Sequence, residues 1–259
     1  MNFLPVVLGL VMTIPLPSTW TPPEKPNAQI ILQEAQADTQ AKRYPDALAR
    51  HLWIHENSVK VDRSFYGVRL SFALMSWLEL GKAYPPAMAA LRTARDDARQ
   101  AVLRPDAKET RESFHDFTSI NRTLGEEAQT KALFAELDRR KSPIAEDVFR
   151  LALPALVKAK EYKLCGNYLQ SKVTLVHCRL FFKFQEQMAK DPQFSDRVRE
   201  ISEKSFISET ATLIALRVIN DRKPEALEIV AVVKKESKSA NLHAALDQAL
   251  QGVVPDSMP

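Results

Sequence analysis

Glycine and cysteine are scarce in this chain, and each shortage excludes a class of chemistry. Only 6 glycines occur in 259 residues, and they form neither a glycine-rich phosphate loop nor the GxSxG motif of serine hydrolases. The 2 cysteines are too few for a disulfide framework, and no CxxC pair of zinc ligands is present. The sequence therefore predicts a protein that is not an enzyme, with no catalytic residues, no cofactor and no metal site.

The chain also lacks a segment in which charges of one sign predominate. The formal net charge is +4 and the pI is about 9.0. Basic residues alternate with acidic residues almost everywhere, as in the segment 92–99. Because a nucleic-acid-binding surface gathers its positive charges on one face, we expect solvated helix faces and no nucleic-acid partner.

No apolar run reaches the length of about 20 residues that a transmembrane helix needs. Residues 1–27 combine an uncharged apolar stretch over 3–16 with a proline-rich linker, which is typical of a signal peptide or short membrane tether. This order predicts export to the periplasm or the medium, with cleavage between Ser18 and Trp20. No Lys or Arg precedes the apolar stretch and no small-x-small site follows it. The alternative is an apolar arm packed on the first helices of a cytoplasmic protein.

The residues that are abundant favour helices. Alanine, leucine, glutamate, lysine, arginine and glutamine lose little side-chain entropy in a helix. No run of alternating apolar residues is long enough to indicate a sheet. We therefore expect an all-α protein.

A sequence pattern recurs where one predicted helix ends and the next begins. Its copies are KRYPDAL, GKAYPPAM, RTLGEEAQ, AKEYKLCG and DRKPEAL. Aligning them places a small residue at Ala47, Ala87, Ala128, Cys165 and Ala226. The intervals are 40 (87 − 47), 41 (128 − 87), 37 (165 − 128) and 61 (226 − 165) residues. Near-equal spacing of the first four indicates stacked helical hairpins.

The residue types of the pattern suit a tight helical turn. A tyrosine stands three residues before the small residue in three copies, at Tyr44, Tyr84 and Tyr162. A small residue lets two helices approach closely, and the tyrosine ring can cover the turn with its hydroxyl in water. Prolines such as Pro45 and Pro85 fit the first turn of the second helix, where an N–H has no partner.

The segment from Tyr44 to Leu48 resembles the central part of a tetratricopeptide repeat (TPR). The spacing of about 40 residues exceeds the family's usual length of about 34. The resemblance implies a right-handed α-α superhelix of about five helix-turn-helix hairpins with a C-terminal capping helix, over residues 28–252. Residues 253–259 are expected to form a flexible tail.

The apolar periodicity gives a map of the expected helices. They lie near 28–42, 45–60, 63–82, 85–102, 107–123, 126–140, 143–160, 163–190, 194–221, 224–236 and 239–251. The helix over 63–82 is apolar nearly all round, which predicts that it is buried between neighbours. The helix over 163–190 is expected to break around Ser171.

A TPR-like superhelix implies a concave face that binds a peptide or partner protein. We expect that face to present polar side chains of the first helix of each hairpin: Gln33, Gln36, Asp38, Arg69, Ser76, Arg111, Ser119 and Arg150. One alternative is a helical small-ligand-binding protein or enzyme with a pocket inside the superhelix. Another is a structural accessory of the cell envelope, tethered through residues 1–20.

Two histidine motifs have a chemical and a structural interpretation. His51 and His55 are four residues apart on a predicted helix and could share a metal ion, but the glutamate of the zincin motif is absent. His115 and Asp116 could be offered as a catalytic dyad, but neighbours on a helix point in different directions. We favour core packing for both motifs.

The most apolar part of the second half, residues 173–184, contains further candidates. Cys165, His177 and Cys178 lack the spacing of a metal site or a nucleophile pair, which favours core packing. The stretch itself is predicted to be a core helix. If Phe181, Phe182 or Phe184 were exposed instead, they would form a partner-binding patch.

Overall fold

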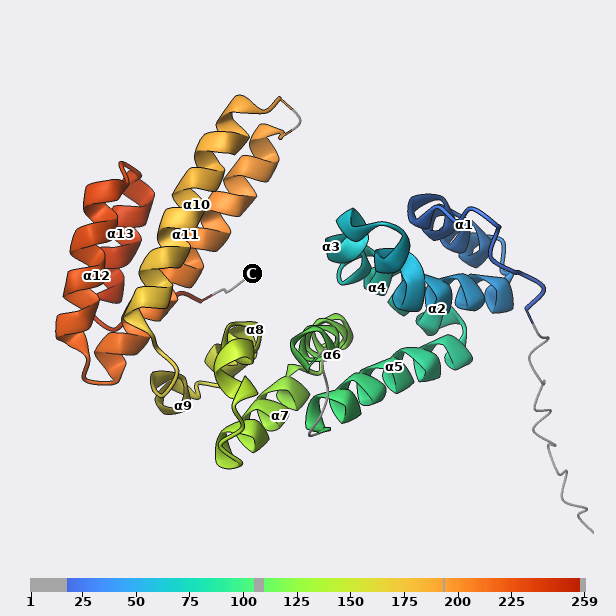
Figure 1. Cartoon of the computed structure of the whole chain (residues 1–259), viewed down its shortest axis with the longest axis horizontal. Helices are drawn as coiled ribbons and strands as arrows, with labels where there is room; N and C mark the ends of the chain where they lie inside the picture. Colours follow the sequence, from blue (N-terminus) through green and yellow to red (C-terminus); the bar gives the residue numbers. More distant parts are fainter. Residues whose placement is uncertain (1–17, 105–109, 193, 257–259) are drawn as a thin grey trace, which may run out of the picture. The chain divides into compact units, whose positions relative to one another are not determined.

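The secondary structure is entirely helical in the residues that the structure describes. A computed structural model describes residues 18–104, 110–192 and 194–256, which form 13 α-helices, one short 3-10 helix and no strand (Figure 1). The prediction of an all-α chain is confirmed. The chain divides into two compact units, residues 1–126 (unit 1) and 127–259 (unit 2).

Unit 1 is built from helices that pack mostly on their neighbours in sequence. α1 packs on α2, α4 packs on α5, and α5 packs on α6. The elements are α1 (Ala28–Gln40), α2 (Tyr44–Val61), η1 (Arg63–Phe65), α3 (Tyr66–Arg69), α4 (Phe72–Ala83), α5 (Pro85–Leu103) and α6 (Thr110–Leu124).

Unit 2 contains two long neighbouring helices, α10 and α11, with α12 and α13 alongside them (Figure 1). The elements are α7 (Glu127–Arg139), α8 (Ile144–Lys158), α9 (Tyr162–Gly166), α10 (Ser171–Lys190), α11 (Asp196–Ile219), α12 (Lys223–Glu236) and α13 (Ala240–Ala249). The chain leaves the helical path after Gly166 and resumes it at Ser171. The predicted break around Ser171 is confirmed.

Five turns between helices share one backbone geometry. Lys42, Gly125, Lys141, Lys160 and Asp221 adopt φ values of 59°, 71°, 52°, 57° and 60°. In each case the next residue's N–H bonds back to the carbonyl five residues earlier, as in the 2.8 Å bond from Arg43 N to Asp38 O. This is the Schellman closure of a helix, in which the left-handed residue lets the chain satisfy the last carbonyls.

At four of the five turns the fifth residue after the left-handed residue is buried, whereas after Lys141 this position is the exposed Glu146. Ala47, Cys165 and Ala226 each lie five residues after such a residue and are 0% exposed. The same spacing after Gly125 leads to Thr130, which is buried. The prediction of Ala128 for this position was wrong by two residues, and Ala128 is exposed.

The second copy of the pattern closes its turn without a left-handed residue. Tyr84 is extended, and Pro85 begins α5 directly. A Cβ on Gly81 would lie 3.2 Å from the backbone of Met88, so glycine lets the two helices meet here. Ala87 is fully buried, and its carbonyl accepts a 3.0 Å hydrogen bond from Trp77 Nε1. The rings of Tyr44 and Tyr84 stack, half-buried, against the same core.

The prediction of one continuous, fully buried helix over 63–82 was wrong. The segment consists of η1, α3 and α4, with an interruption at Leu70 and Ser71. The Ser71 hydroxyl donates a 2.7 Å bond to Gly67 O, a local side-chain bond that competes with the helical ladder. The Phe72 and Met75 side chains are 68% and 60% exposed, so only one side of α4 is buried.

The two ends of the described chain contact the helices. The Asp46 carboxylate accepts bonds of 2.7 Å from Ser18 Oγ and 2.8 Å from Thr19 N, and the Trp20 ring lies under Arg50. The apolar stretch over 3–16 lies outside the described residues. At the other end Val254 packs against the core of unit 2. In the described part of the chain, no helix combines the length and apolar character that crossing a membrane requires.

His51 occupies a core position, as predicted. Its ring stacks on Trp77 with the centroids 6.0 Å apart, and Ser76 Oγ lies 3.4 Å from Nε2. The ring is 1% exposed, and Nδ1 has no hydrogen-bond partner among the described residues. Burial lowers the pKa of His51 from 6.5 to about 4, so the imidazole is neutral at physiological pH.

This burial predicts a loss of stability in mild acid. The unfolded chain protonates His51 below pH 6.5, whereas the folded chain does so only near its lowered pKa of about 4. The free energy of unfolding is therefore highest above pH 6.5 and falls by roughly 2 to 3 kcal/mol between pH 6.5 and 4.5 because of this residue. Urea unfolding of the wild type and of His51→Gln at several pH values measures the effect. Equal pH slopes for the two proteins would contradict it.

Candidate interaction surface

The polar residues expected on a concave face lie in different environments. Gln33, Gln36 and Arg111 are exposed, and Ser76 and Arg150 are half-buried. Asp38, Arg69 and Ser119 are only 3%, 7% and 2% exposed, so their side chains are not presented to a partner. The eight residues therefore do not form one exposed polar surface.

The buried members of that set hold helices together. The Asp38 carboxylate at the end of α1 binds the guanidinium groups of Arg43 and Arg50. Arg69 pairs with Asp116 of α6 and lies 3.3 Å from His55 O. A buried charge is retained at low cost only when it is paired in this way.

The other proposed site residues are separated by their contacts. The Tyr66 hydroxyl lies 2.9 Å from His115 Nδ1, while Asp116 points to Arg69, so His115 and Asp116 form no dyad. Cys165 and Cys178 are buried free thiols, whose pKa values burial raises to about 12 and about 11. The core-packing interpretation of both cysteines is confirmed.

The feature that the structure adds is a stripe of exposed apolar side chains along α10. Val173, Val176, Leu180 and Phe184 are 45%, 55%, 61% and 42% exposed. Their spacing of three or four residues places them on one side of the helix over three turns. These four residues are called the apolar stripe below.

The opposite side of α10 is held by an aromatic contact with α11. The rings of Phe181 and Phe206 stack with centroids 3.9 Å apart, and Phe182 meets Phe206 edge-on at 5.6 Å. Phe206 is 4% exposed. The helix thus has one apolar side in the core and a second apolar side in water. Of the three phenylalanines, only Phe184 is on the exposed side.

A groove between α10 and α11 adjoins the apolar stripe. Its volume is about 410 Å³. The lining residues are His177, Phe181, Val198, Ile201, Ser202, Ser205, Phe206 and Glu209. His177 and Phe181 are next to Val176 and Leu180 in sequence, and Val198 and Ile201 are themselves 46% and 57% exposed. The groove and the stripe therefore form one continuous surface, called here the α10–α11 face.

One end of the groove carries a carboxylate that is already paired. Glu209 contacts Arg150 of α8 and lies 3.5 Å from His177 Nε2. Burial alone would raise the pKa of Glu209, but the hydrogen bond from His177 and the charge of Arg150 outweigh it and lower the pKa below its usual value. This arrangement leaves apolar contact as the main chemistry of the groove.

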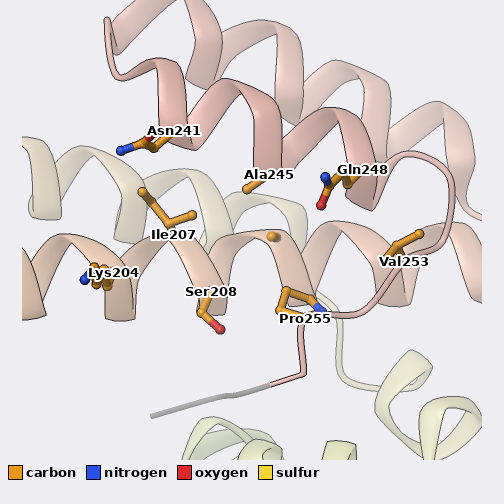
Figure 2. A pocket seen from close by; sticks show the side chains of 9 residues that line it. Lys204, Ile207, Ser208, Asn241, Ala245, Gln248, Val253 and Pro255 are labelled. Carbon is orange, nitrogen blue, oxygen red and sulfur yellow. The ribbon is translucent and has the colours of Figure 1, made fainter.

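A second groove of about 370 Å³ lies between α11 and α13 (Figure 2). Its lining comes from α11, from α13 and from the C-terminal segment: Lys204, Ile207, Ser208, Ala211, Asn241, Ala245, Gln248, Val253 and Pro255. Residues of the predicted C-terminal tail thus cover part of the space between the two helices. This groove has no adjoining stripe of exposed apolar residues comparable to that of α10 within the described residues.

The sequence contained a signal for the α10–α11 face. Apolar residues in 173–184 fill two sides of one helix, whereas a helix with a single core contact needs only one. Val198 and Ile201 were missed because each stands alone among the charged and polar residues at the start of α11. Across residues 18–104, 110–192 and 194–256, no group of three or more His, Cys, Asp or Glu side chains is placed to bind a metal ion.

The two sides of α10 should respond differently to truncation. Phe206→Ala removes the ring that joins α10 to α11, and we expect a loss of about 3 to 5 kcal/mol in the free energy of unfolding. Phe184→Ala removes a ring that is 42% exposed and should cost about 1 kcal/mol or less. Urea denaturation of both variants measures the difference. Equal losses would mean that Phe184 belongs to the core.

Comparison of the chain with protein-family models, with curated proteins and with solved structures finds no match.

Proposed function

We propose that this protein is a protein-interaction module that binds its partner through the α10–α11 face of unit 2. The observation that carries the proposal is the apolar stripe, whose four side chains are between 42% and 61% exposed. Exposed apolar side chains clustered in this way are a typical mark of an interaction site, because contact with a partner removes their surface from water.

The form of the face suits a helical or extended segment of a partner. Helix-in-groove recognition uses apolar anchors at intervals of three and four residues, seated between two helices. The groove of about 410 Å³ supplies a recess beside the stripe. The face replaces the scattered polar residues of the sequence prediction as the candidate binding surface.

We also retain, as a proposal, the TPR-like right-handed superhelix of helical hairpins. Its support is the turn geometry shared by Lys42, Gly125, Lys141, Lys160 and Asp221, with a buried residue five positions later at every turn except that of Lys141. A recurrent turn of this kind is what stacked hairpins require.

Site-specific photo-crosslinking tests the binding face. A benzoyl-phenylalanine in place of Leu180 should yield covalent adducts with a partner in cells that express the protein. The same group in place of Leu227 serves as the control, because Leu227 is 48% exposed on α12. Adducts specific to position 180 are expected. Identical adduct patterns at the two positions would refute the proposal.

Charge substitution gives an independent check on the same face. In the protein with the cross-linking group at position 180, Val176→Glu should abolish recovery of the cross-linked partner, whereas Leu227→Glu should leave it unchanged. Val176 and Leu227 are 55% and 48% exposed, so both substitutions should leave the unfolding midpoint unchanged. Loss of the partner in both variants would show that the effect is not specific to α10.

Export remains a separate proposal that rests on residues 1–20. Mass spectrometry of the mature protein should show a new amino terminus between Ser18 and Trp20. Recovery of an intact Met1 in a soluble fraction would refute export.

A further inference from the structure

One flank of the apolar stripe carries a row of lysines. Lys172, Lys183 and Lys190 are exposed, and their separations of 11 (183 − 172) and 7 (190 − 183) residues correspond to about three turns and two turns of helix. They therefore lie along the same side of α10. Lys172 precedes Val173 and Lys183 precedes Phe184, so the lysine row borders the stripe along its length.

The far rim of the groove, on α11, is also basic. Arg197 is exposed and directly precedes Val198, a lining residue of the groove. Lys204, two turns further along, lines the groove between α11 and α13 and is paired with Glu200, its Nζ lying 2.6 Å from Glu200 Oε1, so it adds no uncompensated charge to this rim. The apolar floor thus lies between the lysines of α10 on one side and Arg197 on the other.

The acidic groups near this surface are mostly committed to other contacts. Glu209 is paired with Arg150 and His177. Glu203 accepts a 2.9 Å bond from Ser239 Oγ, and Glu200 is paired with Lys204. Glu186 is the exposed carboxylate of α10. The three lysines of α10 therefore set the sign of the charge that a partner meets beside the stripe.

The length of the stripe indicates the size of what it contacts. From Val173 to Phe184 the helix advances 11 residues (184 − 173), which is about 16 Å at 1.5 Å per residue. Three turns of a second helix have the same length. Such a helix can place side chains at i, i+4 and i+7 against the stripe and in the groove.

From these observations we propose that the partner segment is an acidic amphipathic helix, with aliphatic or aromatic residues on one side and Glu or Asp beside them. This inference rests on the proposed function and specifies the chemistry of the ligand. The lysine row of α10 steers and orients an acidic helix, while the apolar stripe supplies the contact. The recessed groove favours a peptide over a lipid surface, because a recess accommodates the separate side chains of a helix.

Two synthetic peptides test the charge preference on the full-length protein. Both carry leucines at i, i+3, i+4 and i+7, and one has glutamates where the other has lysines on the flanks. Fluorescence anisotropy at 50 mM and 300 mM NaCl measures their affinities. The acidic peptide should bind at least about tenfold more tightly at low salt, and the preference should shrink at high salt because the charges lie at the surface.

Charge-reversal variants locate the preference on α10. The triple variant Lys172→Glu/Lys183→Glu/Lys190→Glu should bind the acidic peptide about tenfold more weakly and the basic peptide more tightly than the wild type does. The control variant Lys223→Glu/Lys235→Glu/Lys238→Glu changes the net charge by the same amount. Its three lysines are exposed and lie on α12 and in the loop that follows it. It should leave both affinities unchanged. Circular dichroism verifies that each variant keeps the helical content of the wild type.

The outcomes separate this inference from the proposed function. If the wild type bound both peptides with equal affinity and Leu180→Glu bound neither, the acidic preference would be overturned. The binding face itself would then be supported. No binding of either peptide, together with sedimentation on phosphatidylserine vesicles that the lysine reversals abolish, would identify an anionic membrane instead. Equal weakening by the α12 control would show a non-specific charge effect and also overturn the inference.

Discussion

The closure of helix ends by a left-handed residue is the constraint on which the hairpins depend. At five turns a residue with positive φ reverses the chain and lets its neighbours bond the last carbonyls of the preceding helix. At four of these turns the residue is Lys42, Lys141, Lys160 or Asp221 and not glycine, which agrees with the low glycine content. A side chain in this conformation costs about 1 kcal/mol or more, so the contacts made by the following helix must offset it.

Those contacts begin with the small residue five positions after the turn. Ala47, Cys165 and Ala226 are fully buried at this position. A larger side chain would separate the two helices, since protein interiors have no spare volume. The copies of the sequence pattern at Ala47, Cys165 and Ala226 thus combine a left-handed turn with a close helix contact, whereas the copy at Ala87 reaches the same contact from the extended Tyr84.

The two units use polar groups and aromatic rings in different ways. In unit 1, ion pairs such as that of the buried Arg69 with Asp116 link helices that are far apart in the sequence. In unit 2, the Phe206 contact joins α10 to α11, and the buried Arg217 donates to Thr174 Oγ1 at 3.0 Å. α10 also packs on α12, and these contacts leave its apolar stripe outside the core. The stripe therefore remains in water and forms part of the exposed α10–α11 face.

The sequence by itself determined the helical class, the approximate helix positions and the core location of His51, Cys165 and Cys178. These properties follow from local periodicity and from residue size, which act over a few positions of the chain. Only the tertiary structure decided which polar residues are paired, because Asp38 and Arg69 meet partners from other helices. It also decided which of the two apolar sides of α10 is buried: periodicity finds both sides, but only the position of α11 selects between them.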